Sequence, residues 1–235
     1  MRVAIMQPYF FPYIGYFQLI NATDKWIVFD TVQYIYHGWI NRNRILHPQD
    51  GWQYIIVPLN KHLRDEVIKN VTVVSQNDWK KKILGQLTHY KKKAPYYSQT
   101  IELLNNCFSK NECTLSRLNT EFLSEICRYL EIKFNYEYFS EMDLDIENIN
   151  DPGDWALLIS ERMGATQYIN LPGGQDLFNR QKFTEKNIEL NFIVPNDIKY
   201  VQKKEPFVEN LSILDIMMWN SKEQILHLLK EYELK

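Results

Sequence analysis

The stretch VAIMQPYFFPYIGYF, residues 3–17, carries the strongest fold signal in the sequence. Its first four residues form an aliphatic run that ends at Gln7 and Pro8, which predicts a buried strand whose end delivers a loop. Beyond the loop the period changes. A short helix with one buried stripe is indicated by four residues at helical spacing: Tyr13, Tyr16, Phe17 and Ile20.

The next apolar run, 26–29, ends at Asp30 and completes a unit of strand, helix and strand. Such a unit is parallel and right-handed by default. The same alternation returns in the second half of the chain, where we expect strands at 133–139, 167–171 and 188–194 and helices at 154–163, 211–219 and 224–234.

Two segments interrupt this rhythm. An inserted antiparallel hairpin is predicted between 31 and 60 by short runs at 33–36, 42–46 and 52–57. A strand at 71–74 precedes a helical lobe at about 78–131, with helices at 79–93, 96–109 and 115–131. We therefore expect residues 1–235 to form a single α/β domain with three layers, a mainly parallel sheet, the antiparallel hairpin insertion and the helical lobe.

Composition narrows the class of protein. The 27 Lys and Arg residues nearly balance the 29 Asp and Glu residues, so no global field would gather a nucleic acid duplex. The three cysteines form no C-x-x-C pair, and the N-terminal apolar run is too short for a signal peptide or a membrane span. We expect a cytoplasmic protein without membrane insertion.

The common catalytic and nucleotide-binding signatures are absent from the sequence. The five histidines show no i, i+4 or H-x-H pairing, so no structural metal is expected. Asp143 and Asp145 match the letters of a D-x-D motif, but they fall in an acidic loop rather than at a strand end.

The first candidate site is the turn at residues 7–16, where a parallel strand hands over to a helix N-terminus and backbone N–H groups can meet a phosphate. Gln7 offers a donor and an acceptor, Tyr9 or Phe10 could stack on a base or sugar, and Gly15 permits close approach next to Tyr16. The competing interpretation is that these rings only fill the core under the first helix.

The second candidate is WINRNRI, residues 39–45. On a strand, Asn41 and Asn43 share one face, where they could orient a sugar or an oxyanion. Arg42 and Arg44 share the other face, where they could clamp a diphosphate. A solvated edge strand is the competing interpretation. The nearest candidates for a proton acceptor lie just upstream: Asp30 and His37.

The third candidate is LPGGQD, residues 171–176, where Gly173, Gly174 and Asp176 open a short helix and could form a nest of N–H donors. An ordinary tight turn explains the same letters. The lysine runs 80–82 and 91–93 are interpreted as solvated surface.

Several of these stretches together resemble the WbqC-like family: 3–17, 30–33, 39–45, 57–58, 168–176 and 211–215. The likeness spans nearly the whole chain. The resemblance implies a bacterial cytoplasmic protein associated with the synthesis of O-antigen, capsule or a related surface polysaccharide.

We expect a ligand in the crevice at the carboxyl ends of the first two strands. The leading hypothesis is a transferase that attaches an acyl or aminoacyl group to the amine of a nucleotide-linked amino sugar, with Asp30 or His37 as the base and an activated acyl donor as cosubstrate. The alternatives are a metal-dependent glycosyltransferase or sugar nucleotidyltransferase, and a non-catalytic adaptor that binds a sugar nucleotide. The oligomeric state stays open.

Overall fold

A computed structural model describes residues 1–75, 78–202 and 206–235. Its main feature is a six-stranded sheet in the order β5-β2-β1-β6-β7-β8. Every neighbouring pair is parallel except β7 and β8, which run antiparallel. The strands are β1 (Arg2–Met6), β2 (Lys25–Val28), β5 (Tyr136–Tyr138), β6 (Gln167–Asn170), β7 (Glu189–Pro195) and β8 (Tyr232–Leu234).

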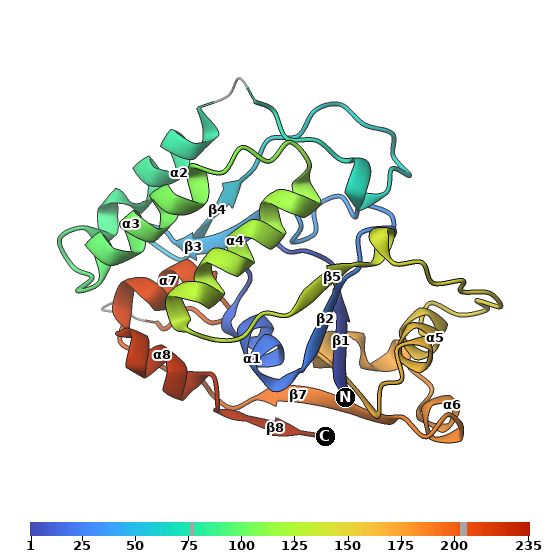
Figure 1. The fold of residues 1–235 in the computed structure, drawn as a ribbon. Helices are drawn as coiled ribbons and strands as arrows, with labels where there is room; N and C mark the ends of the chain where they lie inside the picture. Colours follow the sequence, from blue (N-terminus) through green and yellow to red (C-terminus); the bar gives the residue numbers. More distant parts are fainter. Residues whose placement is uncertain (76–77, 203–205) are drawn as a thin grey trace.

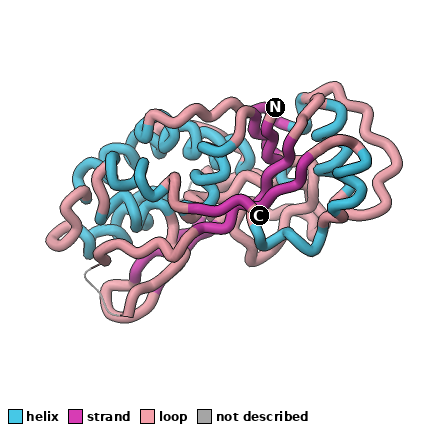
Figure 2. Tube along the Cα trace, turned by 90° about the horizontal axis from the view of Figure 1, so that it is seen from below, coloured by secondary structure: helices cyan, strands magenta, loops and turns pink. Residues whose placement is uncertain are grey.

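Helices cover both faces of this sheet, and Figure 2 shows strands in the middle with helices on either side. One face packs α1 (Ile14–Ala22), α4 (Leu115–Leu130), α7 (Ile213–Trp219) and α8 (Lys222–Leu228), and the other packs α5 (Asp154–Arg162) and α6 (Arg180–Glu185) (Figure 1). Alternation along β1 sends Ala4 to the first layer and Val3 and Ile5 to the second. The structure confirms the expected three-layer α/β fold.

The inserted hairpin is also confirmed, as β3 (Arg42–Leu46) paired antiparallel with β4 (Trp52–Ile56). Two helices of the expected lobe accompany α4: α2 (Trp79–Leu87) and α3 (Tyr97–Phe108). Among the described residues, the remaining elements are four short 3-10 helices: η1 (Ile68–Asn70), η2 (Thr88–Tyr90), η3 (Phe139–Glu141) and η4 (Pro172–Leu177).

Some predicted elements are wrong. The strands predicted at 33–36 and 71–74 are reduced to isolated bridges, because each segment meets a partner at single positions only, such as Gln33 with Val67. The helix predicted at 79–93 ends as α2 at Leu87 and continues only as the 3-10 turn η2. The last helix ends at Leu228, and the residues beyond it form β8, because the free edge of β7 offers unpaired backbone groups.

The strand order reverses direction at β1. The chain moves from β1 to β2 on one side, and later returns to place β6 on the other side. The segment after β1 leads to α1 on one face, while the segment after β6 leads to α6 on the opposite face. Loops that part in this way leave a crevice at the carboxyl ends of β1 and β6, which is where ligands bind in open α/β sheets.

The loop between β1 and α1, residues 7–12, is irregular and partly buried, so its carbonyl groups need partners other than water. Asn43 donates from its amide nitrogen to the carbonyls of Phe10 and Phe11, at 3.0 and 2.9 Å. Asn119 donates to the carbonyl of Pro8 at 2.9 Å. Side chains from β3 and α4 therefore hold this loop in place.

The same loop is also fixed by the start of α7. The Ser212 hydroxyl donates to the carbonyl of Phe11 at 2.8 Å, and the backbone N–H of Ile213 donates to the carbonyl of Pro12 at 2.9 Å. Phe11 itself has a positive φ of 41°, a strained conformation for a residue with a bulky side chain. The surrounding hydrogen bonds and the core hold Phe11 in this conformation.

We expect Asn43→Ala to lower the free energy of unfolding by about 2 to 4 kcal/mol, because it leaves two carbonyl groups without their donor. Urea unfolding followed by circular dichroism measures the loss. Asn106→Ala, at an exposed position of α3, is the matched control and should change the free energy by about 0.5 kcal/mol or less. Equal stability of the two variants would contradict the role assigned to Asn43.

Candidate functional site

A cavity of about 250 Å³ lies between the opening loop and β3, and we call it the arginine cavity. It is lined by Tyr9, Pro12, Tyr13, Trp39, Asn43, Arg44 and Asn210. The first and second candidate sites of the sequence therefore meet in space.

Arg44 supplies the positive charge of this cavity. Its guanidinium carbon lies 5.3 Å from the ring centre of Trp39 and 5.1 Å from that of Trp52, so two indoles hold the group in place. One terminal nitrogen donates to the carbonyl of Asn210 at 3.3 Å, and the buried Nε has no hydrogen-bond partner among the described residues. A guanidinium carries five N–H donors, so the part of it that lines the cavity can donate to an anionic ligand.

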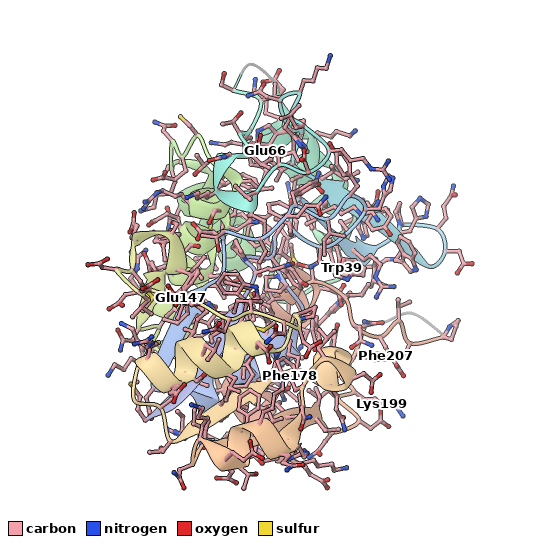
Figure 3. All side chains as sticks on the ribbon, turned by 90° about the vertical axis from the view of Figure 1, so that its right-hand side faces the viewer. Trp39, Glu66, Glu147, Phe178, Lys199 and Phe207 are labelled. Atoms are coloured by element: carbon pink, nitrogen blue, oxygen red, sulfur yellow. The ribbon has the colours of Figure 1, made fainter. Side chains whose placement is uncertain are left out.

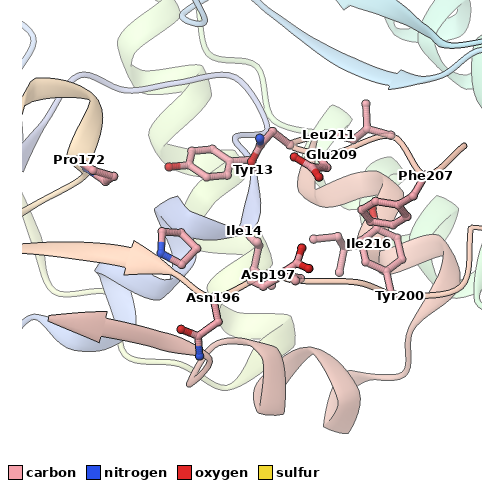
Figure 4. Close-up of a pocket in the computed structure, with 13 residues that line it drawn as sticks. Tyr13, Ile14, Pro172, Asn196, Asp197, Tyr200, Phe207, Glu209, Leu211 and Ile216 are labelled. Carbon is pink, nitrogen blue, oxygen red and sulfur yellow. The ribbon is translucent and has the colours of Figure 1, made fainter.

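A second cavity of about 360 Å³ adjoins the first, since Tyr13 and Asn210 line both. We call it the carboxylate cavity, because the carboxyl groups of Asp197 and Glu209 point toward each other across it (Figure 4). Asp197 forms an ion pair with Lys199, whose Nζ lies 2.6 Å from the Asp197 oxygen. The guanidinium of Arg44 and the carboxyl groups of Asp197 and Glu209 therefore lie in neighbouring cavities.

The carboxylate cavity lies at the reversal of strand order. Tyr13 follows β1, Pro172 follows β6, and Pro195 ends β7. In Figure 3, Trp39 and Phe207, which line the arginine and carboxylate cavities respectively, lie on the same side of the molecule. The sequence predicted a crevice at the ends of the first two strands, whereas these cavities lie over β1, β6 and β7.

Tyr13 is positioned by Gly15 in the first turn of α1. A Cβ atom on Gly15 would lie 2.5 Å from the Tyr13 ring, so glycine lets the ring fold back over the helix. Burial raises the pKa of Tyr13 to about 12, and its hydroxyl stays protonated at neutral pH. Tyr13, which lines both cavities, therefore keeps a hydroxyl that can donate a hydrogen bond.

The other residues predicted in the opening turn have different surroundings. Tyr9 lines the arginine cavity and contacts the ring of Tyr16. Phe10 and Tyr16 are fully buried in the core and line neither cavity. The Tyr16 hydroxyl donates to the backbone carbonyl of Gln7. For Phe10 and Tyr16 the structure matches the core-filling interpretation.

The predicted residues of the hairpin region divide between the two faces of β3. Arg42 and Arg44 share the outer face, and Asn43 points inward, as alternation required. The side-chain oxygen of Asn41 accepts from Tyr34 at 2.8 Å and its nitrogen donates to the carbonyl of Val57 at 3.1 Å. The amide groups of Asn41 and Asn43 are thus engaged within the protein.

The two predicted proton acceptors lie outside both cavities. Asp30 is buried and accepts from the backbone N–H and the hydroxyl of Ser140, at 3.1 and 2.8 Å. His37 is exposed with a φ of 63°, and its carbonyl accepts from Arg42.

The third candidate segment forms η4. Pro172 reaches the carboxylate cavity, whereas Gly173 and Gly174 line neither of the two cavities. Asp176 lines a separate hollow on the side of α5 and α6, where Lys182 forms ion pairs with Asp151 and Asp154. The structure does not bring Asp176 together with Arg44.

Sequence reasoning missed the wall formed by the segment after β7, which carries Asp197, Glu209 and Asn210. It carries no periodic pattern, and its acidic residues look like solvated loop residues in the sequence. The signal that could have found it is Asp215, because a carboxylate between apolar residues of a predicted helix calls for partners.

Asp215 anchors this wall from inside the protein. Its carboxylate accepts from the hydroxyls of Tyr90 and Tyr200, at 2.5 and 2.6 Å, and from the amide of Gln202 at 3.2 Å. Burial raises the pKa of Asp215 to about 6. Tyr200 in turn lines the carboxylate cavity, so this buried network fixes one of its walls.

Across 1–75, 78–202 and 206–235, no group of three or more His, Cys, Asp or Glu side chains is arranged to hold a metal ion. Within the same residues, no helix has both the length and the apolar character needed to cross a membrane.

Fold and cavities together describe an α/β protein with two adjoining cavities at its strand-order reversal. Residues 7–227 match the model of the WbqC-like protein family, and the chain belongs to this family. It is similar to the uncharacterized protein Rv1507c of Mycobacterium tuberculosis (strain ATCC 25618 / H37Rv), with 28% identity over 218 residues that cover 92% of each chain. No solved structure matches the chain.

The raised pKa of Asp215 predicts a pH dependence of stability. The folded state binds this proton more tightly than the unfolded state, whose pKa is near 3.8. The contribution is therefore complete below about pH 4 and is lost as the pH rises through about 6, a change on the order of 2 to 3 kcal/mol.

Asp215→Asn should remove this dependence. The difference in unfolding free energy between the wild type and this variant should shift against the wild type from pH 4 to pH 7, measured by urea unfolding at each pH. Asp145→Asn, at an exposed position, is the control and should follow the wild type throughout. A constant difference between the wild type and Asp215→Asn would refute the assignment.

Proposed function

We propose that this protein is a transferase that binds a nucleotide-linked amino sugar and attaches an acyl or aminoacyl group to the sugar amine. One observation carries the proposal: a cavity with a guanidinium between aromatic rings adjoins a cavity with two facing carboxylates. A nucleotide-linked amino sugar is anionic at its diphosphate and cationic or hydrogen-bonding at its amine, so its two ends match the two cavities.

The arginine cavity suits the nucleotide end. Arg44 keeps donors for a phosphate oxygen, and its stacking on Trp39 and Trp52 reduces the freedom lost on binding. Tyr9 and Trp39 offer ring faces on which a base or a sugar could pack.

The carboxylate cavity suits the amine. In this proposal Asp197, paired with Lys199, orients the amino group, and Glu209 on the opposite wall accepts its proton. The neutral amine attacks the acyl carbonyl, a carbon–nitrogen bond forms, and the bond to the leaving group of the activated acyl donor breaks. Tyr13 lines both cavities, and in this proposal its hydroxyl stabilises the oxyanion. Asp30 and His37 have no part in this assignment, because neither lines the arginine cavity or the carboxylate cavity.

Family membership adds the biological setting. The resemblance implies the synthesis of a bacterial surface polysaccharide, such as O-antigen, and acylated amino sugars fit that setting. The proposed reaction is therefore a step in the synthesis of a bacterial surface polysaccharide.

A direct test combines binding and turnover. Nucleoside diphosphate-linked amino sugars and their hydroxyl analogues are titrated calorimetrically with and without magnesium, and each binder is then incubated with a panel of acyl-coenzyme A donors and analysed by mass spectrometry. Metal-free preference for the amine and a product heavier by one acyl group support the proposal. Binding without turnover over a broad donor panel points to an adaptor instead, and indifference to all nucleotide sugars refutes both.

The facing carboxylates favour one second candidate, metal-dependent glycosyl or nucleotidyl transfer. Asp197 and Glu209 could hold a divalent cation together with a substrate phosphate, a common arrangement for magnesium. Nucleotide-sugar binding that requires magnesium in the same titration would select this candidate over acyl transfer.

We expect Arg44→Ala to weaken nucleotide-sugar binding by about tenfold to a hundredfold, because it removes a charge-assisted contact to phosphate. Arg42→Ala is the matched control: Arg42 lies on the same face of β3 and stacks on Tyr54, but it does not line the arginine cavity. Its affinity should stay within about threefold of the wild type. Equal losses in the two variants would argue against a phosphate site at Arg44.

We expect Glu209→Gln to impair the reaction at the substrate amine while leaving binding of the nucleotide end unchanged. The variant should lower the rate of acyl transfer by about a hundredfold or more, because the proton acceptor is lost. Its affinity for the hydroxyl analogue should match that of the wild type, as measured by calorimetry. A variant with normal acyl transfer would remove Glu209 from the mechanism.

A further inference from the structure

Charge is distributed unevenly along the chain. Residues 31–93 contain 11 Lys and Arg against 4 Asp and Glu, whereas the rest of the chain contains 16 against 25. The net charge of −2 therefore conceals a basic part and an acidic part. The basic part comprises the β3–β4 hairpin, its flanking loops, and α2 with the turn that follows it.

The hairpin presents one face to solvent. On this ribbon face, which we define as Arg42, Arg44, Trp52, Tyr54 and Ile56, each arginine lies over a ring of the partner strand. Trp52 is 41% and Ile56 46% exposed. The opposite side chains, including Asn43 and Ile55, are buried against the core. The ribbon face therefore combines exposed apolar groups with fixed positive charge.

Neighbouring segments extend this surface in both directions. At one end, Tyr36 stacks on His62 at a ring distance of 5.2 Å, next to Leu63, which is 69% exposed. At the other end, Lys93 and the hairpin turn residue His47 line one small cavity, so the lysine run 91–93 lies beside the hairpin tip. Figure 3 shows the hairpin projecting from the body beyond Trp39.

We propose that the ribbon face and these extensions dock the protein on the surface of an anionic lipid bilayer. Exposed Trp, Tyr and aliphatic side chains favour the boundary between lipid headgroups and acyl chains, and Lys and Arg are attracted to anionic headgroups. The acidic remainder of the chain would be repelled by the same surface, which orients the protein.

The observations favour a bilayer over an acidic protein partner. The positive charge is spread over the hairpin, the loop at 61–69 and the lysine run 91–93, rather than gathered around one pocket. An extended plane of negative charge matches such a distribution. Ile35, Ile56 and Leu63 are exposed aliphatic residues that can contact the acyl chains of a bilayer. Charge attraction to an acidic protein would not require them.

Docking has a consequence for the cavities. Arg44 belongs both to the ribbon face and to the arginine cavity. The bound protein would therefore hold that cavity at the headgroup level. This inference is independent of the transfer chemistry, because it concerns the outer face of the hairpin.

Vesicle co-sedimentation without any nucleotide tests the proposal, so its failure is distinct from failure of the proposed function. With about 30% phosphatidylglycerol in phosphatidylcholine, we expect binding that falls by about tenfold or more in pure phosphatidylcholine or at high salt. Brominated lipids should quench tryptophan fluorescence, because Trp39 and Trp52 are 38% and 41% exposed. Equal binding to neutral vesicles would overturn the proposal.

Matched variants locate the surface. Ile35→Ser with Ile56→Ser and Leu63→Ser should lower vesicle affinity by about tenfold, whereas Leu177→Ser with Val201→Ser and Leu234→Ser, exposed positions outside the basic part, should not. Lys91→Glu with Lys92→Glu should also weaken binding, and Lys133→Glu with Lys230→Glu should not. Unchanged melting temperatures show that each variant is folded.

Two results would assign the face to another occupant and overturn the proposal. In the first, sedimentation velocity would reveal a dimer that dissociates when Ile35, Ile56 and Leu63 are replaced by serine. The face would then be a contact between copies of the chain. Alternatively, soluble polyglutamate would compete fully with the vesicles and brominated lipids would give no quenching, which indicates an acidic polymer or protein partner.

Discussion

Hydrogen bonds to the partly buried, irregular loop at residues 7–12 hold the main parts of the fold together. The carbonyl groups of this loop lie at the end of β1 without strand partners, and each unpaired group would cost about 1 to 3 kcal/mol. Asn43, Asn119 and Ser212 satisfy three of these positions from β3, α4 and the start of α7. One short loop thus joins the hairpin, the helical lobe and the C-terminal helices into one body.

The same constraint shapes the cavities. Because the loop is fixed against β3, Tyr9 and Tyr13 meet Arg44 in the arginine cavity. Because the strand order reverses at β1, the segments after β6 and β7 complete the carboxylate cavity on the other side of Tyr13. The buried Asp215 holds Tyr200 and with it the outer wall. The hydrogen bonds that fix the fold around β1 therefore also position the residues that line the two cavities.

Much of the fold could be predicted from local patterns. The strand at 3–6, the helix stripe through Tyr16 and the hairpin around 42–57 follow from periodicity, and each forms as expected. The C-terminal strand β8 could not be predicted, because pairing with the free edge of β7, rather than the intrinsic β propensity of its three residues, stabilises it. Among the predicted site residues, Tyr9 and Arg44 line one cavity, whereas Phe10 and Tyr16 are buried in the core.

Local patterns in the sequence predict the α/β class and place the two arginines on one strand face, because the period of apolar residues and the chemistry of turns are local properties. Which side chains share a cavity depends instead on how distant segments pack. Asp197 and Glu209 lie more than 150 residues from Arg44 in the chain, and no local pattern specifies their meeting. That meeting depends on strand order and on hydrogen bonds to the loop at 7–12, which exist only in the folded chain.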